Sequence, residues 1–215
     1  MESAPNIIEV KSGASKADKG RTGGANMNRQ CRFDNAAKEY LYTFYGILDE
    51  MIWCMTGAEQ GESISCNFIM QMIPHHQAAI EMSKNVLKYT ENKTLCKIAE
   101  QIIEEQTKSI SDMLNIKRCC CMEKNSKEDL CRYRENTEKI MQTMFREMKG
   151  TCASGQVNCD FMWEMIPHHE GAVRMAENAL CFPLCKELIP ILQSIITSQK
   201  RGIEQMRNLL RCMGC

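Results

Sequence analysis

The sequence predicts an all-α protein, a helical bundle made of two tandem repeats with pseudo-two-fold symmetry. From Asn35 onward the apolar residues recur at helical spacing, and no segment shows the alternation that is typical of a strand. The chain also matches itself when it is shifted by 93 residues. The shift aligns Cys66 with Cys159, His75 with His168, Met82 with Met175, Gln106 with Gln199, Met113 with Met206, and Cys119 with Cys212. These matches indicate an internal repeat.

The composition changes near residue 30. Residues 1–30 are polar, rich in Gly, Ser and Lys, and without apolar periodicity, which predicts a disordered N-terminal arm. Residues 31–215 are expected to form a single helical-bundle domain, with repeat one at about 35–122 and repeat two at about 127–215.

Five breaks interrupt the helical pattern of this domain. They fall at Gly57 to Gly61 and at "YTENKT", "CCCMEKNSKED", "GTCASGQVN" and "CFPLC". The predicted helices are Asn35–Met55, Ser63–Lys88, Lys93–Lys117, Lys127–Lys149, Val157–Leu180 and Leu184–Arg211. Because a unit of three amphipathic helices cannot bury its apolar face alone, we expect the two repeats to pack on each other.

Charge and hydropathy exclude several partners. Lys plus Arg and Asp plus Glu number 27 each, so we expect neither nucleic acid nor an anionic membrane as a partner. Apolar runs such as "FIMQMI" are far shorter than the roughly 20 residues of a membrane span. The N-terminal sequence has no export pattern, which predicts a cytoplasmic protein, or an extracytoplasmic one if a signal peptide has been removed. The chain has 14 cysteines, a number typical of an exported disulfide protein or a metal binder.

All four histidines lie in a doubled motif. The segment "MIPHHQAAIEM" at 72–82 returns as "MIPHHEGAVRM" at 165–175. At 100° per residue, the Met, His and Ala positions of each copy fall within an arc of about 120° on one helix face. Pro74 and Pro167 lie just before the histidines, and each is expected either to bend a continuous helix or to begin a shorter one.

The residue types of this face indicate a soft metal ion. Thioether sulfur suits Cu(I), whereas imidazole binds several transition metals, so Cu(I) fits best and Zn or another soft metal is the alternative. Met113 and Met206 lie on the next helix of each repeat, where an antiparallel hairpin brings them towards the histidines. The candidate ligands are His75, His76, Met72, Met82, Met113, His168, His169, Met165, Met175 and Met206. The competing interpretation makes the methionines gap-filling core residues and the histidines hydrogen-bonded ones.

The segments "FIMQMIPHHQAAIEMSKNVL" and "FMWEMIPHHEGAVRMAENAL", with the helices that follow them, resemble the two halves of the family named domain of unknown function 305. The resemblance covers approximately Ser65 to Leu210. It implies a ferritin-like helical fold, copper binding or metal resistance, frequent export, and the ligands given above. Ser109 and Gly202 stand where the family usually has a glutamate.

The cysteines predict a second region of chemistry. Each histidine helix starts where the next helix ends, so we expect Cys66 to approach Cys119 and Cys159 to approach Cys212. The expected thiol cluster comprises Cys66, Cys119, Cys152, Cys159, Cys212 and Cys215, of which the last four could make a four-thiolate site. Cys96, Cys181 and Cys185 are expected at the opposite end. Disulfides, which stabilise by about 2–4 kcal/mol each, are an equal alternative to bound metal.

These observations favour a soft-metal binding protein that buffers, detoxifies or transfers Cu(I) and is not an enzyme. A disulfide-stapled interaction bundle is one alternative. A ferritin-like metal-dependent oxidase is less favoured, because the Glu-x-x-His motif of such sites is absent. The residues three before the histidines are Met72, Ile73, Met165 and Ile166. The aromatic residues from Tyr40 to Tyr45 and Trp53 are expected in the core, with a homo-oligomer surface as the alternative.

Overall fold

The computed structural model describes residues 34–215, and the arm predicted at 1–30 lies outside the described residues. This part of the chain is all-α, with no strand. Its six helices are α1 (Asn35–Thr56), α2 (Ile64–Val86), α3 (Lys93–Cys120), α4 (Lys127–Lys149), α5 (Val157–Ala179) and α6 (Leu188–Met213).

Capping side chains explain why four of the helices begin at the predicted places. The side chains of Asp34, Ser63, Asn92 and Ser126 each accept a hydrogen bond from a backbone N–H of the first turn. The main difference from the prediction is α6, which begins at Leu188 and not at Leu184. The backbone N–H of Cys185 instead donates to Ser65 Oγ at 2.9 Å, so this segment is a loop docked on the start of α2.

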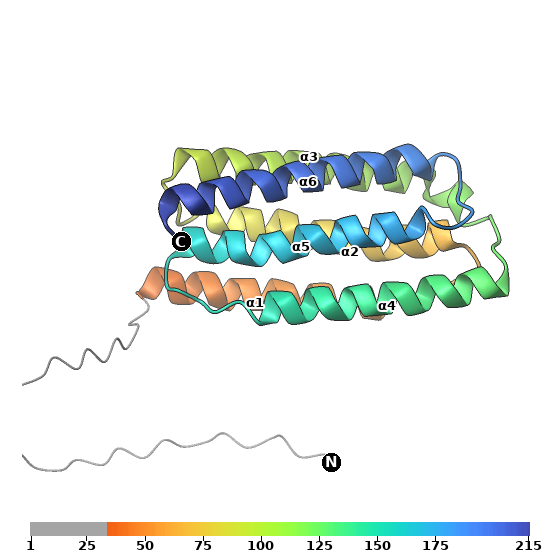
Figure 1. Cartoon of the computed structure of the whole chain (residues 1–215), viewed down its shortest axis with the longest axis horizontal. Coiled ribbons are helices and arrows are strands. Elements are labelled where there is room, and N and C mark those ends of the chain that lie inside the picture. The colour runs from red at the N-terminus through yellow and green to blue at the C-terminus, as the bar shows by residue number, and fades with distance from the viewer. Residues whose placement is uncertain (1–33) are drawn as a thin grey trace, which may run out of the picture. The chain divides into compact units, whose positions relative to one another are not determined.

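The helices form three layers of two (Figure 1). α2 and α5 lie side by side in the middle layer, α3 and α6 cover one face, and α1 and α4 cover the other. Because they are enclosed from both faces, α2 and α5 bury residues on nearly every side, including polar ones. The outer helices bury one stripe each. This arrangement puts the doubled histidine motif at the centre of the bundle.

The two halves of the chain run in opposite directions. Asn125, between α3 and α4, donates from Nδ2 to the carbonyl of Pro183, which precedes α6. At the far end Asn92, before α3, lies with its Nδ2 3.8 Å from Met213 Sδ at the end of α6. Equivalent ends of the two halves therefore lie at opposite ends of the bundle.

This orientation corrects one prediction. Cys185 was expected away from the end that holds Cys66 and Cys119, but its sulfur lies 3.9 Å from that of Cys119. The prediction is wrong because a periodic sequence pattern does not define whether two repeats run parallel or antiparallel.

Both prolines lie inside continuous helices. Pro74 is within α2 and Pro167 is within α5, so neither begins a shorter helix. No helix of the described residues is long and apolar enough to cross a membrane.

Candidate metal centre

The histidines of the two repeats meet in one layer at the centre of the bundle. His75 and His168 have ring centroids 3.7 Å apart, and each lies 5.9 Å from its neighbour in sequence, His76 or His169. All four side chains are at most 2% exposed. We define these four residues as the histidine layer.

Hydrogen bonds satisfy only part of this layer. His168 Nε2 donates to the carbonyl of His75 at 3.1 Å, so the lone pair of His168 is on Nδ1. His76 Nε2 is hydrogen-bonded to Ser109 Oγ of α3 at 3.1 Å. Both ring nitrogens of His75 and the Nδ1 atoms of the other three histidines have no partner among the described residues. Buried polar atoms usually have partners, so this group of unpartnered nitrogen atoms requires an explanation.

Two glutamines add to the unpartnered set. Gln106 of α3 lies one turn before Ser109, and Gln199 of α6 lies one turn before Gly202, the two residues that lie against the layer. Both glutamines are buried. The side-chain nitrogen and oxygen of Gln106 and the side-chain oxygen of Gln199 have no hydrogen-bond partner. In the described chain, the histidine layer and these glutamines carry eight of the twelve buried unpartnered side-chain atoms.

Burial keeps the imidazoles neutral. Desolvation lowers the pKa of His76 to about 3 and that of His168 to about 4. The pKa values of His75 and His169 are well below the ordinary value, first through burial and then through the charge that neighbouring imidazoles would carry. Neutral rings keep a lone pair on one nitrogen, which is the form that binds a metal.

The predicted methionine ligands are all in the core. Met72 and Met82 of α2, Met165 and Met175 of α5, Met113 of α3 and Met206 of α6 are each at most 1% exposed. They belong to the same apolar cluster as the side chains that pack α2 on α5. Their burial is compatible with a ligand role and equally with gap-filling.

The layer is asymmetric where α3 and α6 approach it. Ser109 bonds His76, whereas the equivalent residue Gly202 leaves His169 without such a partner. A Cβ at 202 would lie 3.0 Å from His169 Cδ2 and 3.1 Å from His169 Nε2. Gly202 is therefore required for the present position of His169.

A buried acid on α5 was not predicted as part of a site. Tyr40 of α1 donates from its hydroxyl to Glu164 Oε2 at 2.6 Å, and Glu164 is 2% exposed. Burial, with the nearby charge of Asp160, raises the pKa of Glu164 to about 8, against the lowering effect of the Tyr40 hydrogen bond. The repeat contained a signal, because Gln71 and Tyr133 occupy the equivalent positions.

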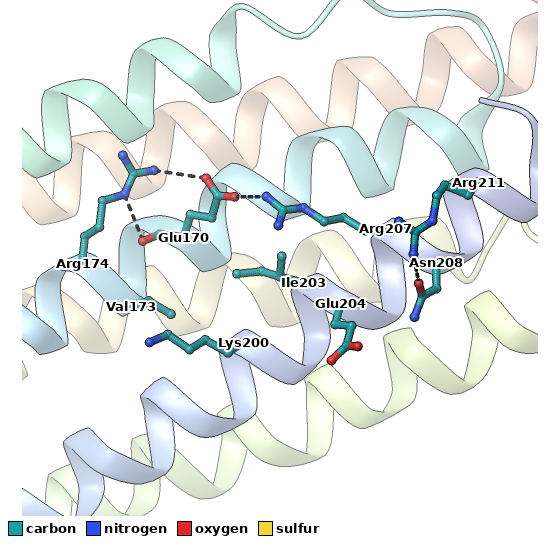
Figure 2. Close-up of a pocket in the computed structure, with 9 residues that line it drawn as sticks. All are labelled: Glu170, Val173, Arg174, Lys200, Ile203, Glu204, Arg207, Asn208 and Arg211. Carbon is teal, nitrogen blue, oxygen red and sulfur yellow. Dashed lines mark hydrogen bonds and ion pairs between the residues drawn. The ribbon is translucent and has the colours of Figure 1, made fainter.

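One surface pocket of the described residues is charged and does not include the histidine layer. It lies between α5 and α6, where Glu170 accepts from both Arg174 and Arg207 (Figure 2). Lys200, Glu204 and Arg211 also line it. The side chains of these ion pairs are 32–58% exposed, so the pocket has no enclosed ligand atoms comparable to those of the histidine layer.

The cysteines pair differently from the prediction. Disulfides join Cys66 to Cys121 and Cys159 to Cys215, not to Cys119 and Cys212. Cys121 and Cys215 lie just after the ends of α3 and α6, so each disulfide forms beyond the last helical turn and not within it. Cys152 and Cys212 are free and exposed, so the expected four-thiolate site with Cys159 and Cys215 is not formed.

Three other cysteines converge. Within residues 34–215, the only group of three or more His, Cys, Asp or Glu side chains whose ligand atoms all lie within 4.8 Å of one another is Cys119, Cys120 and Cys185. We call this group the trithiol cluster. Burial is the main cause that raises the pKa of the Cys120 thiol well above its ordinary value and that of Cys185 to about 11.

The chain matches the family described as Domain of unknown function (DUF305) over residues 59–210. The protein belongs to the DUF305 family. No curated protein and no solved structure matches it. The DUF305 match begins in the loop before α2, so it includes the histidine layer and the trithiol cluster but not α1 with Tyr40.

Proposed function

We propose that the protein binds Cu(I) in its histidine layer and acts in metal buffering, resistance or transfer without catalysing a reaction. The observation that carries this proposal is His75, a fully buried imidazole with two unpartnered nitrogens beside the equally buried His168. An unpartnered buried polar group costs about 1–3 kcal/mol, and a bound metal ion would remove that cost.

The charge state of the layer supports a metal ligand role. Since burial holds the pKa of all four imidazoles far below neutrality, protons do not compete with a metal ion at physiological pH. His75 and His168 would hold the ion through their lone pairs, and the amides of Gln106 and Gln199 would orient the rings.

The surrounding sulfur favours Cu(I) over harder ions. Three methionines from each half are buried in the same core, and thioether is a soft ligand that contributes little to Zn, Mg or Ca sites. Zn or another soft metal held by the imidazoles alone is the alternative. The bound ion would be the protein's cargo, delivered and released, which makes exchange with a metal donor the expected partner interaction.

We also infer that the bundle is ferritin-like, with a pseudo-two-fold axis that passes between His75 and His168. Equivalent hydrogen bonds in the two halves support this inference. Asn85 Nδ2 donates to the carbonyl of Tyr40 at 3.0 Å, and Asn178 Nδ2 donates to the carbonyl of Tyr133 at 3.5 Å. Such an axis would make one shared metal layer out of two copies of the motif.

The test is an anaerobic Cu(I) titration against a competing chelator. The variant carries His75→Asn and His168→Asn, and circular dichroism verifies its helicity. We expect the wild type to bind Cu(I) in the layer and the variant to bind it at least tenfold more weakly. A second variant, His76→Asn, is the matched control because His76 already has Ser109 as a partner, and we expect a smaller loss.

Unchanged stoichiometry and affinity in the folded double variant would refute the proposal. That result would favour a disulfide-stapled interaction bundle in which the histidines are core residues. For an oxidase, carboxylates should face the layer. Among the described residues, the buried acids Asp160 and Glu164 are instead bonded to Ser154, Gly155 and Tyr40.

A further inference from the structure

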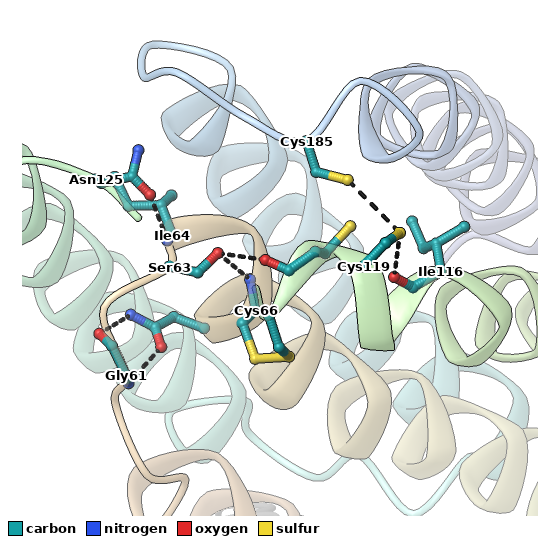
Figure 3. The surroundings of a disulfide bond; sticks show 11 residues. Gly61, Ser63, Ile64, Cys66, Ile116, Cys119, Asn125 and Cys185 are labelled. Atoms are coloured by element: carbon teal, nitrogen blue, oxygen red, sulfur yellow. Dashed lines mark hydrogen bonds between the residues drawn. A yellow bond between two sulfur atoms is a disulfide. The ribbon is translucent and has the colours of Figure 1, made fainter. Parts of the chain in front are cut away.

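The trithiol cluster lies at one end of the bundle, away from the histidine layer. Cys119 and Cys120 are the last residues of α3, and Cys185 comes from the loop before α6. Figure 3 shows the Cys185 sulfur directed towards Cys119, at 3.9 Å. Sulfur atoms that share one metal ion at about 2.3 Å lie about 3.8–4.0 Å apart. The Cys119–Cys185 distance matches that of two ligands to one ion, and Cys120 lies within 4.8 Å of both.

The backbone around the cluster is fixed at several points. The carbonyl of Cys120 accepts from Ser63 Oγ at 2.7 Å, and the N–H of Cys185 donates to Ser65 Oγ at 2.9 Å. Next to Cys120, the disulfide between Cys121 and Cys66 fastens the end of α3 to the start of α2 (Figure 3). The thiols therefore meet because three chain segments are held together, and not by chance contact of mobile side chains.

Burial gives the cluster an inner and an outer side. Cys120 is 0% exposed and Cys185 is 1% exposed, whereas Cys119 is exposed. Cys185 Sγ also donates to Glu187 Oε2 at 3.0 Å, so a carboxylate lies next to the cluster and orients this thiol. An ion can enter at Cys119 and be held by the two buried sulfurs.

We propose that Cys119, Cys120 and Cys185 form a three-thiolate site for Cu(I), distinct from the histidine layer. Thiolate is the softest protein ligand and selects Cu(I), Zn and iron–sulfur clusters. Structural Zn almost always takes four ligands, and no fourth His, Cys, Asp or Glu of the described chain joins this group. Each thiol that binds releases its proton to solvent as its sulfur–copper bond forms, and copper remains Cu(I) throughout, so no oxidant or reductant is needed.

The opposite end of the bundle supplies an internal control. The repeat aligns Cys119 with Cys212, Cys120 with Met213 and Cys185 with Asn92. The contact equivalent to that of Cys120 with Cys185 is present, because Asn92 Nδ2 lies 3.8 Å from Met213 Sδ. Only one of the three positions is a thiol there, so the same backbone arrangement exists without a three-thiolate site.

The experiment compares the wild type, Cys119→Ser and Cys212→Ser. Both cysteines are exposed, so neither change should disturb the core. Each protein, purified anaerobically, is titrated with Cu(I) against a competing chelator and studied by copper X-ray absorption. We expect Cys119→Ser to lose one bound equivalent, or to bind it at least tenfold more weakly, and Cys212→Ser to match the wild type. The wild-type spectrum should show sulfur ligands at about 2.3 Å.

Three results would overturn the proposal. One is equal stoichiometry and affinity in all three proteins. Another is a native disulfide between Cys119 and Cys185, found by peptide mapping of the anaerobically purified protein. The third is tighter binding of Zn²⁺ than of Cu(I) at the Cys119-dependent site. Failure of the histidine proposal is separate, because the variant with His75→Asn and His168→Asn should keep the sulfur-bound equivalent.

Discussion

The two ends of the bundle have the same disulfide framework but different chemistry around it. One end has the disulfide between Cys66 and Cys121 and beside it the trithiol cluster. The other has the disulfide between Cys159 and Cys215, beside Asn92 and Met213. The middle of the molecule differs from the ends, since each half supplies its own pair of adjacent histidines there. The comparison of the two ends shows that the two repeats share backbone positions but carry different side chains at those positions.

Removing the disulfides should have the largest effect on stability and should show how alike the two ends are. The bridges close loops of nearly equal length, with sequence separations of 55 and 56. Chain entropy then gives a loss of roughly 4 kcal/mol in the free energy of unfolding for either one. We expect this loss both for Cys66→Ser with Cys121→Ser and for Cys159→Ser with Cys215→Ser, measured by urea unfolding without reductant.

The two double variants should differ in metal binding. Only the loss of the bridge next to Cys120 should weaken the binding of Cu(I) to the trithiol cluster, because that bridge fixes the end of α3. A stability loss confined to one pair, or equal effects of both pairs on Cu(I) binding, would contradict this comparison.

The buried acid Glu164, which the second half has and the first half lacks, should make the stability of the whole protein depend on pH. The pKa of Glu164 is about 8 in the folded protein, against an ordinary value of 4.5. The unfolded chain therefore loses this proton first, and the contribution of Glu164 to stability falls as pH rises from 4.5 to 8. Glu164→Gln should remove this dependence and stabilise the protein at pH 8 by on the order of 2 kcal/mol.

Unfolding of the wild type and of Glu164→Gln at pH 4.5 and pH 8 measures this effect. Gln71, the equivalent residue, offers the reverse change, Gln71→Glu, which should introduce a similar loss of stability as pH rises. A constant difference between wild type and Glu164→Gln at both pH values would mean that Glu164 does not titrate as described.

The smallest expected effect concerns the partners of the histidine layer. Ser109→Ala removes the hydrogen bond to His76 and makes the first half resemble the second, where Gly202 offers no such bond. We expect a loss of about 1 kcal/mol in the free energy of unfolding. The matched change, Gly202→Ala, should displace His169, which histidine nuclear magnetic resonance signals would report. An unaffected His169 signal would show that the second half has room that the structure does not indicate.

Helix positions were predictable from the sequence because local signals define them. Apolar periodicity and the breaks between periodic segments place four helix starts correctly, and capping residues such as Ser63, Asn92 and Ser126 stabilise these starts in the structure. The all-α class and the DUF305 family are confirmed. The disordered arm and the metal-binding role stay predictions.

Contacts between the halves could not be predicted in the same way. The repeat was visible, but the antiparallel arrangement that brings Cys185 to Cys119 depends on tertiary packing. The hydrogen bond between Tyr40 and Glu164 was missed for the same reason, since 124 residues separate the partners. The predicted disulfide partners were wrong by two positions in the first half and three in the second. The true partners, Cys121 and Cys215, follow the last helical turn, where apolar periodicity gives no information.

The hydrogen bond from Tyr40 to Glu164 also has a consequence for folding. It joins the first helix to the fifth, and the bonds from Cys185 to Ser65 and from His168 to His75 likewise span the two halves. These partners are far apart in sequence, so neither half can complete its core before the other has docked. We therefore expect the halves to unfold in one cooperative transition, and a chain cut between α3 and α4 to remain incompletely folded until both pieces associate.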